Sequence, residues 1–131
     1  MSIYYSESGQ ITLDRSGADH GRFIPKTNED LIKAVELFEF FSDEGVHLTL
    51  DVVPDLNSWD VRNITDMSYL FQYCNHFNLP LDQWDVSKVT KMNRMFDSCT
   101  NFNQPLSSWS SKIGNVIEMS HMFAECRNYN Q

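Results

Sequence analysis

The chain has 131 residues, of which 41% are hydrophobic and 21% charged, so it can form one domain with a buried core. Its net charge of −8 argues against nucleic acid and against an anionic membrane surface as partners, because both would repel it. No segment approaches the roughly 18–20 apolar residues needed to cross a bilayer, and the N-terminus lacks the basic and apolar regions of a secretory signal.

Residues 1–20 predict a β-hairpin. Apolar residues 3–5 and 11–13 flank Ser8-Gly9, a dipeptide typical of tight turns. The excess of negative charge also lies in this part of the chain: residues 1–55 hold 11 acidic and 4 basic side chains, whereas residues 56–131 hold 7 and 6.

The next segment predicts a helix. Thr27 stands at an N-cap position, and Asp30 follows where a capping-box acid would stand. The apolar stripe at helical spacing consists of Leu31, Val35 and Phe38. We expect Gly45 to end this helix, because glycine is common just after a helix C-terminus.

Residues 47–53 alternate between apolar and polar side chains and predict a strand, which Pro54 closes. The hairpin, the helix and this strand together make residues 1–55 an expected N-terminal cap. Such a cap is needed because the first unit of a repeat array otherwise exposes an apolar end and an unpaired edge.

Residues 56–131 contain three copies of one unit. The tryptophans Trp59, Trp84 and Trp109 are evenly spaced along the chain. The other repeated positions are Met67, Met92 and Met119; Phe71, Phe96 and Phe123; Cys74, Cys99 and Cys126; and Phe77, Phe102 and Tyr129. These positions advance by the same step as the tryptophans between the first two units, and the third unit contains a two-residue insertion. A period of about 25 residues predicts a solenoid in which each unit stacks on its own copy.

Within each unit, the spacing of Met, Leu or Met, Phe and Cys predicts about two turns of helix, starting at Thr65 in the first unit and Thr90 in the second. Residues 80–84 and their copies are expected to form short strands that stack as a parallel ladder about 4.8 Å apart. The insertion of the third unit predicts a bulge near Gly114, and Ile117 replaces the threonine there.

Two stretches carry a resemblance to a known family. They are Phe102-Asn103-Gln104-Pro105-Leu106-x-x-Trp109 and Trp84-Asp85-Val86-Ser87-Lys88-Val89-Thr90-x-Met92-x-x-Met95-Phe96-x-x-Cys99. They resemble the 25- to 26-residue BspA-like repeat of bacterial surface proteins and lipoproteins, and the resemblance covers residues 56–131.

This resemblance implies an α/β, leucine-rich-repeat-like, right-handed solenoid of short strands and short helices, here with an N-terminal helix-plus-strand cap. It also implies adhesion or protein–protein contact, and it brings no catalytic residues. Family members are often on the cell surface. This chain shows no export signal, so a cytoplasmic location is its default expectation.

The three cysteines occupy one repeat position, so we interpret them as a ladder of small buried side chains. A disulfide or a metal site remains the alternative. Cys74 with His76, or Cys126 with His121, has the residue types of a catalytic dyad, but two ligands do not complete a zinc site.

Asp60 and Asp85 also occupy one repeat position, and Ser110 takes the third place. We favour hydrogen bonding at a corner of each unit for these carboxylates, and a calcium-binding stack is the alternative. We therefore expect no catalytic site, no cofactor and no bound metal.

Solenoids recognise partners through the variable positions on one face. Tyrosine and arginine are enriched in interface hot spots, and the candidate partner-binding residues are Tyr69, Tyr73, Lys91 and Arg94. The alternative for each of them is ordinary solvated surface. The first hypothesis is therefore a non-enzymatic repeat module for protein–protein interaction or adhesion.

The alternative function is a structural element that assembles with its own copies. Gln131 stands where another Pro-Leu of the repeat would follow, and no polar cap comes after it. We expect either a chain cut from a longer array or a homo-oligomer that pairs through its C-terminal end.

Overall fold

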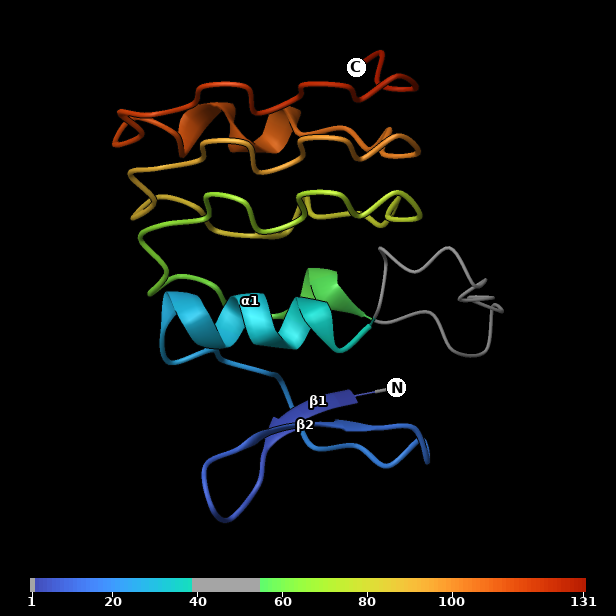
Figure 1. Cartoon of the computed structure of the whole chain (residues 1–131). Coiled ribbons are helices and arrows are strands. Elements are labelled where there is room, and N and C mark those ends of the chain that lie inside the picture. Colours follow the sequence, from blue (N-terminus) through green and yellow to red (C-terminus); the bar gives the residue numbers. More distant parts are fainter. Residues whose placement is uncertain (1, 39–54) are drawn as a thin grey trace.

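A computed structural model describes residues 2–38 and 55–131 of the chain (Figure 1). Its elements are strands β1 (Ser2–Tyr5) and β2 (Ile11–Asp14), helix α1 (Asn28–Glu36), and the 3-10 turns η1 (Leu56–Ser58) and η2 (Ser107–Ser111). The remaining described chain consists of turns and extended pieces that wind into three stacked coils. We call them the first coil (residues 56–80), the second coil (81–105) and the third coil (106–131).

The predicted hairpin is confirmed. Strands β1 and β2 pair antiparallel, with Ile3 opposite Leu13. The turn closes through a 2.8 Å hydrogen bond from the Gly9 N–H to the Ser6 carbonyl, and Gly9 has a φ of 83°. Glycine suits this position because a side chain would be strained at positive φ.

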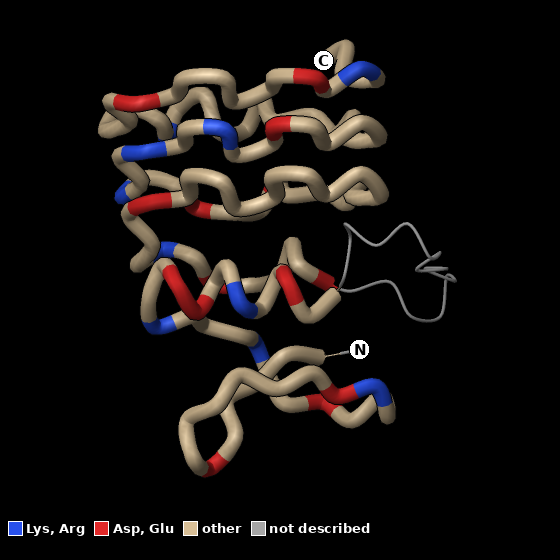
Figure 2. The backbone as a smooth tube through the Cα atoms, viewed as in Figure 1, with Lys and Arg blue, Asp and Glu red and all other residues tan. Residues whose placement is uncertain are grey.

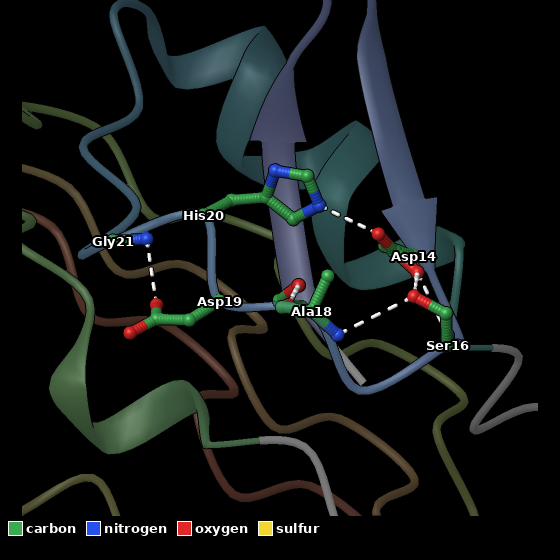
Figure 3. A network of polar contacts seen from close by, with 7 residues as sticks. Asp14, Ser16, Ala18, Asp19, His20 and Gly21 are labelled. Carbon is green, nitrogen blue, oxygen red and sulfur yellow. Dashed lines mark hydrogen bonds and ion pairs between the residues drawn. The ribbon is translucent and has the colours of Figure 1, made fainter.

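A polar network ties the segment after β2 back to the hairpin (Figure 3). The Asp14 carboxylate contacts His20 Nε2 at 2.6 Å and accepts the Ser16 N–H at 2.7 Å. The His20 ring also stacks on Tyr4, with ring centroids 3.7 Å apart. The hydrogen bonds from His20 and then from Ser16 hold the pKa of Asp14 well below its usual value.

Helix α1 begins as predicted. Thr27 is its N-cap and accepts a 3.0 Å hydrogen bond from the Asp30 N–H. The buried face of the helix consists of Leu31, Ala34 and Val35, with Phe38 buried just beyond it. The helix ends at Glu36, earlier than predicted; Gly45 and the predicted strand 47–53 lie outside the described residues.

Helix α1 lies against the outer side of the first coil (Figure 1). The Asn28 side-chain oxygen accepts hydrogen bonds from the Thr65 and Asp66 N–H groups, at 3.1 and 3.4 Å. Phe38 and Trp59 approach with ring centroids 6.1 Å apart. The helix therefore supplies hydrogen-bond acceptors and apolar surface to the side of the first coil that faces away from the second.

The coils are joined by two rows of backbone hydrogen bonds at alternate residues. From the first coil, the N–H groups of Met67, Tyr69, Phe71 and Tyr73 donate to the carbonyls of Lys91, Asn93, Met95 and Asp97, at 2.8–2.9 Å. From the second coil, the N–H groups of Met92, Arg94, Phe96 and Ser98 donate to Glu118, Ser120, Met122 and Ala124, at 2.7–2.9 Å. Equivalent residues therefore lie next to one another along the stack.

Aromatic columns form the core of the stack. Phe71, Phe96 and Phe123 stack with centroid distances of 5.6 and 5.5 Å. Beside them run Phe77, Phe102 and Tyr129, at 5.4 and 5.7 Å. Because Phe96 and Phe102 are fully buried, the middle of the stack is closed to solvent.

The prediction of a two-turn helix within each unit is wrong. Residues 65–74 and 90–99 form successive turns, and two residues of each unit have positive φ. Thr90 caps no helix: its N–H donates to the Thr65 carbonyl at 2.8 Å and its hydroxyl donates to the same oxygen at 3.2 Å. The parallel contacts between coils take the place of the helical hydrogen bonds.

The predicted strands at residues 80–84 are also absent from this part of the described chain. A turn closed by a 3.1 Å bond from the Trp84 N–H to the Leu81 carbonyl lies there instead. The insertion of the third unit is taken up by η2, which has five residues where η1 has three. This lengthened 3-10 turn precedes Gly114, where the bulge was expected.

Candidate interaction face

Within the described chain, six residues with side chains adopt positive φ, and all six belong to two columns along one edge of the stack. The first column consists of Tyr69, Arg94 and His121, and the second of Tyr73, Ser98 and Glu125. We call these two columns the left-handed face. Because each coil repeats the same backbone conformation, the six side chains emerge at equivalent places on successive coils.

Positive φ is unfavourable for a residue with a side chain, at roughly 1–2 kcal/mol each. In this fold the positive φ lets the backbone N–H bond to the next coil while the carbonyl of the same residue accepts a bond within its own coil. The Tyr69 N–H donates to Asn93 in the next coil, while the Tyr69 carbonyl accepts from the Gln72 N–H within its own coil. The intercoil hydrogen bonds offset the strain and hold the side chain outward.

Tyr69 and Tyr73 have the largest exposed fractions of any tyrosines in the described chain. They are 53% and 60% exposed, and no hydrogen bond of either hydroxyl group is formed within the described residues. Large aromatic side chains on rigid backbone lose little entropy when they are covered by a partner. The structure thus presents both predicted tyrosines to solvent.

Arg94 lies in the same column as Tyr69, but its side chain already forms an ion pair within the chain. Its guanidinium group contacts the buried Asp97 carboxylate at 2.9 Å. Burial on its own would raise the pKa of Asp97, and hydrogen bonds from Gln72, Arg94 and Ser98 outweigh it and lower the pKa. Asp97 therefore stays ionised and fixes the direction of Arg94.

Lys91, the fourth predicted residue, lies outside the two columns. It is exposed and forms parallel bridges with Asp66 on one side and Glu118 on the other. Its backbone therefore lies between those of acidic residues in the two neighbouring coils. Figure 2 marks where basic and acidic residues fall along the backbone of the stack. The predicted set is close together along one edge, with Lys91 flanking the columns.

Three members of the face, Ser98, His121 and Glu125, were not among the residues predicted from the sequence. His121 and Glu125 are exposed and stand at the positions of Tyr69 and Tyr73 in the third coil. His121 follows Arg94 by the same number of residues as Phe123 follows Phe96. The repeat alignment therefore already indicated that His121 is the counterpart of Arg94.

The three cysteines are free thiols at equivalent positions of the coils; Cys74 and Cys99 are buried and Cys126 is partly buried. The Cys99 thiol donates to the Phe71 carbonyl at 2.8 Å, and the Cys126 thiol donates to the Phe96 carbonyl at 2.7 Å. Burial raises the pKa of the Cys74 thiol to about 12, and it raises the pKa of Cys99 and Cys126 as well. Thiols in this state are poor nucleophiles because the thiolate is the reactive form.

The recurring aspartates hydrogen-bond at corners of the coils. Asp60 accepts the Arg62 N–H at 3.1 Å and pairs with its guanidinium group at 2.8 Å, whereas Asp85 accepts the Ser87 N–H at 3.0 Å. The side-chain hydrogen bond from Arg62 is the main cause that lowers the pKa of Asp60 to about 2. In residues 2–38 and 55–131, no group of three or more His, Cys, Asp or Glu side chains is arranged to hold a metal ion.

No helix in the described part of the chain has the length and hydropathy to cross a membrane. The fold and the face together define a protein of stacked repeat coils with a row of outward side chains. Residues 36–131 match the family described as "Mycoplasma protein of unknown function, DUF285", and the chain belongs to this family. Searches of curated proteins and of solved structures gave no match.

Proposed function

We propose that the chain is a non-enzymatic repeat module that binds another protein through the left-handed face. The observation that carries this proposal is the exposure of Tyr69 and Tyr73, at 53% and 60%, on strained backbone that aims them into solvent. Tyrosine and arginine contribute more than most residues to interface energy. Tyr69, Tyr73, Lys91 and Arg94 are the contact residues of this proposal, and His121 extends the face into the third coil.

The architecture we propose is a leucine-rich-repeat-like, right-handed solenoid related to the BspA-like repeat. The two rows of intercoil hydrogen bonds and the aromatic columns support it. Solenoids bind partners through such extended surfaces, because successive repeats place their variable side chains in line. Adhesion, as in bacterial surface repeat proteins, is the form of binding that this relationship favours.

Two observations support a role without catalysis. The thiols of Cys74 and Cys99 are buried, with raised pKa, and the Cys74 thiol faces the Gln72 carbonyl at 3.8 Å. The corner carboxylates are held by backbone N–H groups, as for Asp85 and Ser87. The nucleophilic and acidic residues singled out in the sequence thus have structural partners.

Self-assembly through the third coil is the second candidate. The observation that favours it is apolar exposure at that end: Met119 is 44% exposed and Phe123 37%, whereas Met92 and Phe96 are fully buried.

Affinity capture from the source cells tests the proposal. The bait is the whole chain, compared with a variant carrying Tyr69→Ala, Tyr73→Ala and Arg94→Ala. The matched control carries Gln83→Ala and Lys88→Ala, two exposed positions away from the left-handed face. We expect a protein retained by the wild type and by the control to be lost from the triple variant. Equal capture by all three baits would contradict the proposal.

A further inference from the structure

A cavity beside strand β1, where the segment that follows β2 returns past it, has a positively charged lining. Its volume is 310 Å³, and its lining includes Arg22, Lys26 and His20 but no aspartate or glutamate. This lining contrasts with the net charge of −8 of the whole chain. The cavity is at the lower end of the roughly 300–1,000 Å³ found for small-molecule sites. Its size and charge therefore suit a small anionic ligand.

Arg22 presents its guanidinium group in a fixed position. Its Nε donates to the Ser58 carbonyl at 2.5 Å, which anchors the side chain on the first coil. Its two terminal nitrogens form no hydrogen bond and no ion pair within the described residues. A guanidinium group in this state offers a planar pair of N–H donors that matches two oxygens of a phosphate or carboxylate. Because the group is already anchored, less side-chain entropy is lost when an anion binds.

Lys26 is also held in place. Its ammonium group lies 4.4 Å from the centroid of the Tyr5 ring, and its backbone N–H donates to the Tyr5 hydroxyl group at 2.7 Å. The same hydroxyl group donates to the Asp30 carboxylate at 2.8 Å. This nearby carboxylate therefore has its own partner and does not line the cavity. The Lys26 ammonium group has no ion pair among the described residues, so its charge is open to a ligand.

His20 adds a hydrogen-bonding group without adding net charge. Its Nε2 contacts the Asp14 carboxylate at 2.6 Å, and its ring stacks on Tyr4 with a centroid distance of 3.7 Å (Figure 3). These two contacts fix the plane of the ring, and Nδ1 has no partner within the described part of the chain. When both ring nitrogens carry protons, Nε2 donates to Asp14 and Nδ1 is left to donate to an anion.

A second cavity borders Arg22 and suits an anion poorly. It has a volume of 580 Å³, and Asp19 and Asp55 are among its lining residues. Carboxylates at this place would repel a negatively charged ligand. Of the two cavities that Arg22 borders, the one beside β1 is thus the better candidate for an anion.

We propose that the cavity beside β1 binds the phosphate group of a small phosphate monoester, with Arg22 and Lys26 as the cationic contacts. A phosphate monoester carries roughly 1.5–2 negative charges at neutral pH, which matches two fixed cations better than the single charge of a carboxylate. Ile24 also lines the cavity and is 48% exposed, so it offers apolar contact to the organic part of such a ligand. This inference does not depend on the left-handed face.

A titration of the whole chain, followed by the NMR signals of its backbone amides at constant ionic strength, tests the site. The probes are phenyl phosphate, inorganic phosphate and benzoate. Phenyl phosphate should shift the amide signals of Gly21, Arg22 and Lys26 in a saturable way. Inorganic phosphate should bind more weakly at the same amides, because it lacks the apolar part. Benzoate has the ring but only one charge, and its affinity should be lower than that of phenyl phosphate by about tenfold.

Variants of the chain identify the contacts. The double variant Arg22→Gln, Lys26→Gln should weaken the binding of phenyl phosphate by about tenfold or more, because both cations are lost. The matched control Lys33→Gln, Lys88→Gln removes the same charge from exposed positions outside the cavity and should bind as the wild type does. Slow exchange of the Phe71 amide, which bonds to the second coil, verifies that each variant is folded.

The single variant Arg22→Lys separates charge from geometry. It keeps the positive charge but lacks the planar pair of donors, so its affinity for phenyl phosphate should lie between those of the wild type and the double variant. Three outcomes would overturn the proposal. They are shifts that grow linearly and spread over the whole surface, equal binding by the double variant and its control, and an affinity for benzoate equal to that for phenyl phosphate.

Discussion

Trp84 Nε1 donates a 2.7 Å hydrogen bond to the carbonyl oxygen of Leu56, which lies 28 residues earlier in the sequence. Trp109 makes the same contact with Leu81 at 3.0 Å, again 28 residues earlier. The recurring tryptophan therefore links each coil to the one before it through a polar bond within the apolar core. This relationship explains why the indole recurs at a place where any large apolar side chain could fill the volume.

Trp84→Phe should lower the free energy of unfolding by about 1–3 kcal/mol, because it removes a buried donor and leaves a small cavity. The control is Trp59→Phe, since the Trp59 ring packs on Phe23 and Phe38 and bonds to no earlier coil in the described chain. Urea unfolding of both variants measures the difference. An equal loss in the two would show that the intercoil bond contributes nothing specific.

Phe96→Ala should cost about 3–5 kcal/mol, because the ring is fully buried between two others and its removal leaves a cavity. The same change at Phe123, which is 37% exposed, should cost less than half as much. Thermal unfolding compares the pair. Similar losses would mean that the ring of the third coil is buried in solution, as it would be if another molecule covered it.

Tyr69→Val should destabilise the chain by about 1–2 kcal/mol, whereas Tyr69→Asn should be close to neutral. Tyr69 has a φ of 66°, a conformation that β-branched side chains avoid and asparagine tolerates. Because the side chain is exposed, the comparison isolates backbone strain from packing. Chemical denaturation of the two variants gives the result, and an asparagine variant as unstable as the valine variant would argue against the left-handed turn.

The Asp60–Arg62 pair should stabilise the chain in a way that depends on pH. The folded pKa of Asp60 is lowered to about 2, chiefly by the Arg62 side chain, so the ionised form favours folding. This contribution is complete above the ordinary aspartate pKa and is lost as the pH falls from about 4 towards about 2. The melting temperature of Asp60→Asn should therefore fall furthest below wild type at pH 5–7.

The difference between Asp60→Asn and wild type should shrink as the pH approaches 2. In an Arg62→Ala background the substitution should have a smaller effect throughout, because the main cause of the lowered pKa is gone. A difference that stays constant from pH 7 to pH 2 would rule out this linkage.

The thiols should react in the order of their burial. In the folded chain a thiol reagent at pH 8 should modify Cys126 first, because this thiol is only partly buried. Cys74 and Cys99 should react slowly, since both are buried with raised pKa. All three should react at similar rates in denaturant. Mass spectrometry of time points gives the order, and early modification of Cys99 would contradict the packing.

The period of the sequence predicted which residues lie together, because equivalent positions of a repeat stack whatever the local backbone. It did not predict the backbone itself. Met67, Leu70, Phe71 and Cys74 point inward at the spacing of a helix face, yet two tight turns give the same spacing. The positive φ of Tyr69 and Tyr73 is what replaces the helix, and tyrosine gives no sign of this in a sequence.

The candidate face was partly predictable for the same reason. Tyr69 and Tyr73 vary between units while their neighbours repeat, which indicated exposure, and both are exposed. The pairing of Arg94 with the buried Asp97 was not predictable, because it depends on where the turn brings the two side chains. The flanking of Lys91 by Asp66 and Glu118 depends in turn on the alignment of three coils.

The most direct test of the stacked coils is a solution NMR measurement of contacts between the aromatic rings. Phe71, Phe96 and Phe123 stack at 5.6 and 5.5 Å, so their ring protons should show nuclear Overhauser effects between units that are distant in the sequence. Effects between Phe71 and Phe96, and between Phe96 and Phe123, are the predicted result. Ring contacts confined to neighbours in the sequence would contradict the stack and the face that it presents.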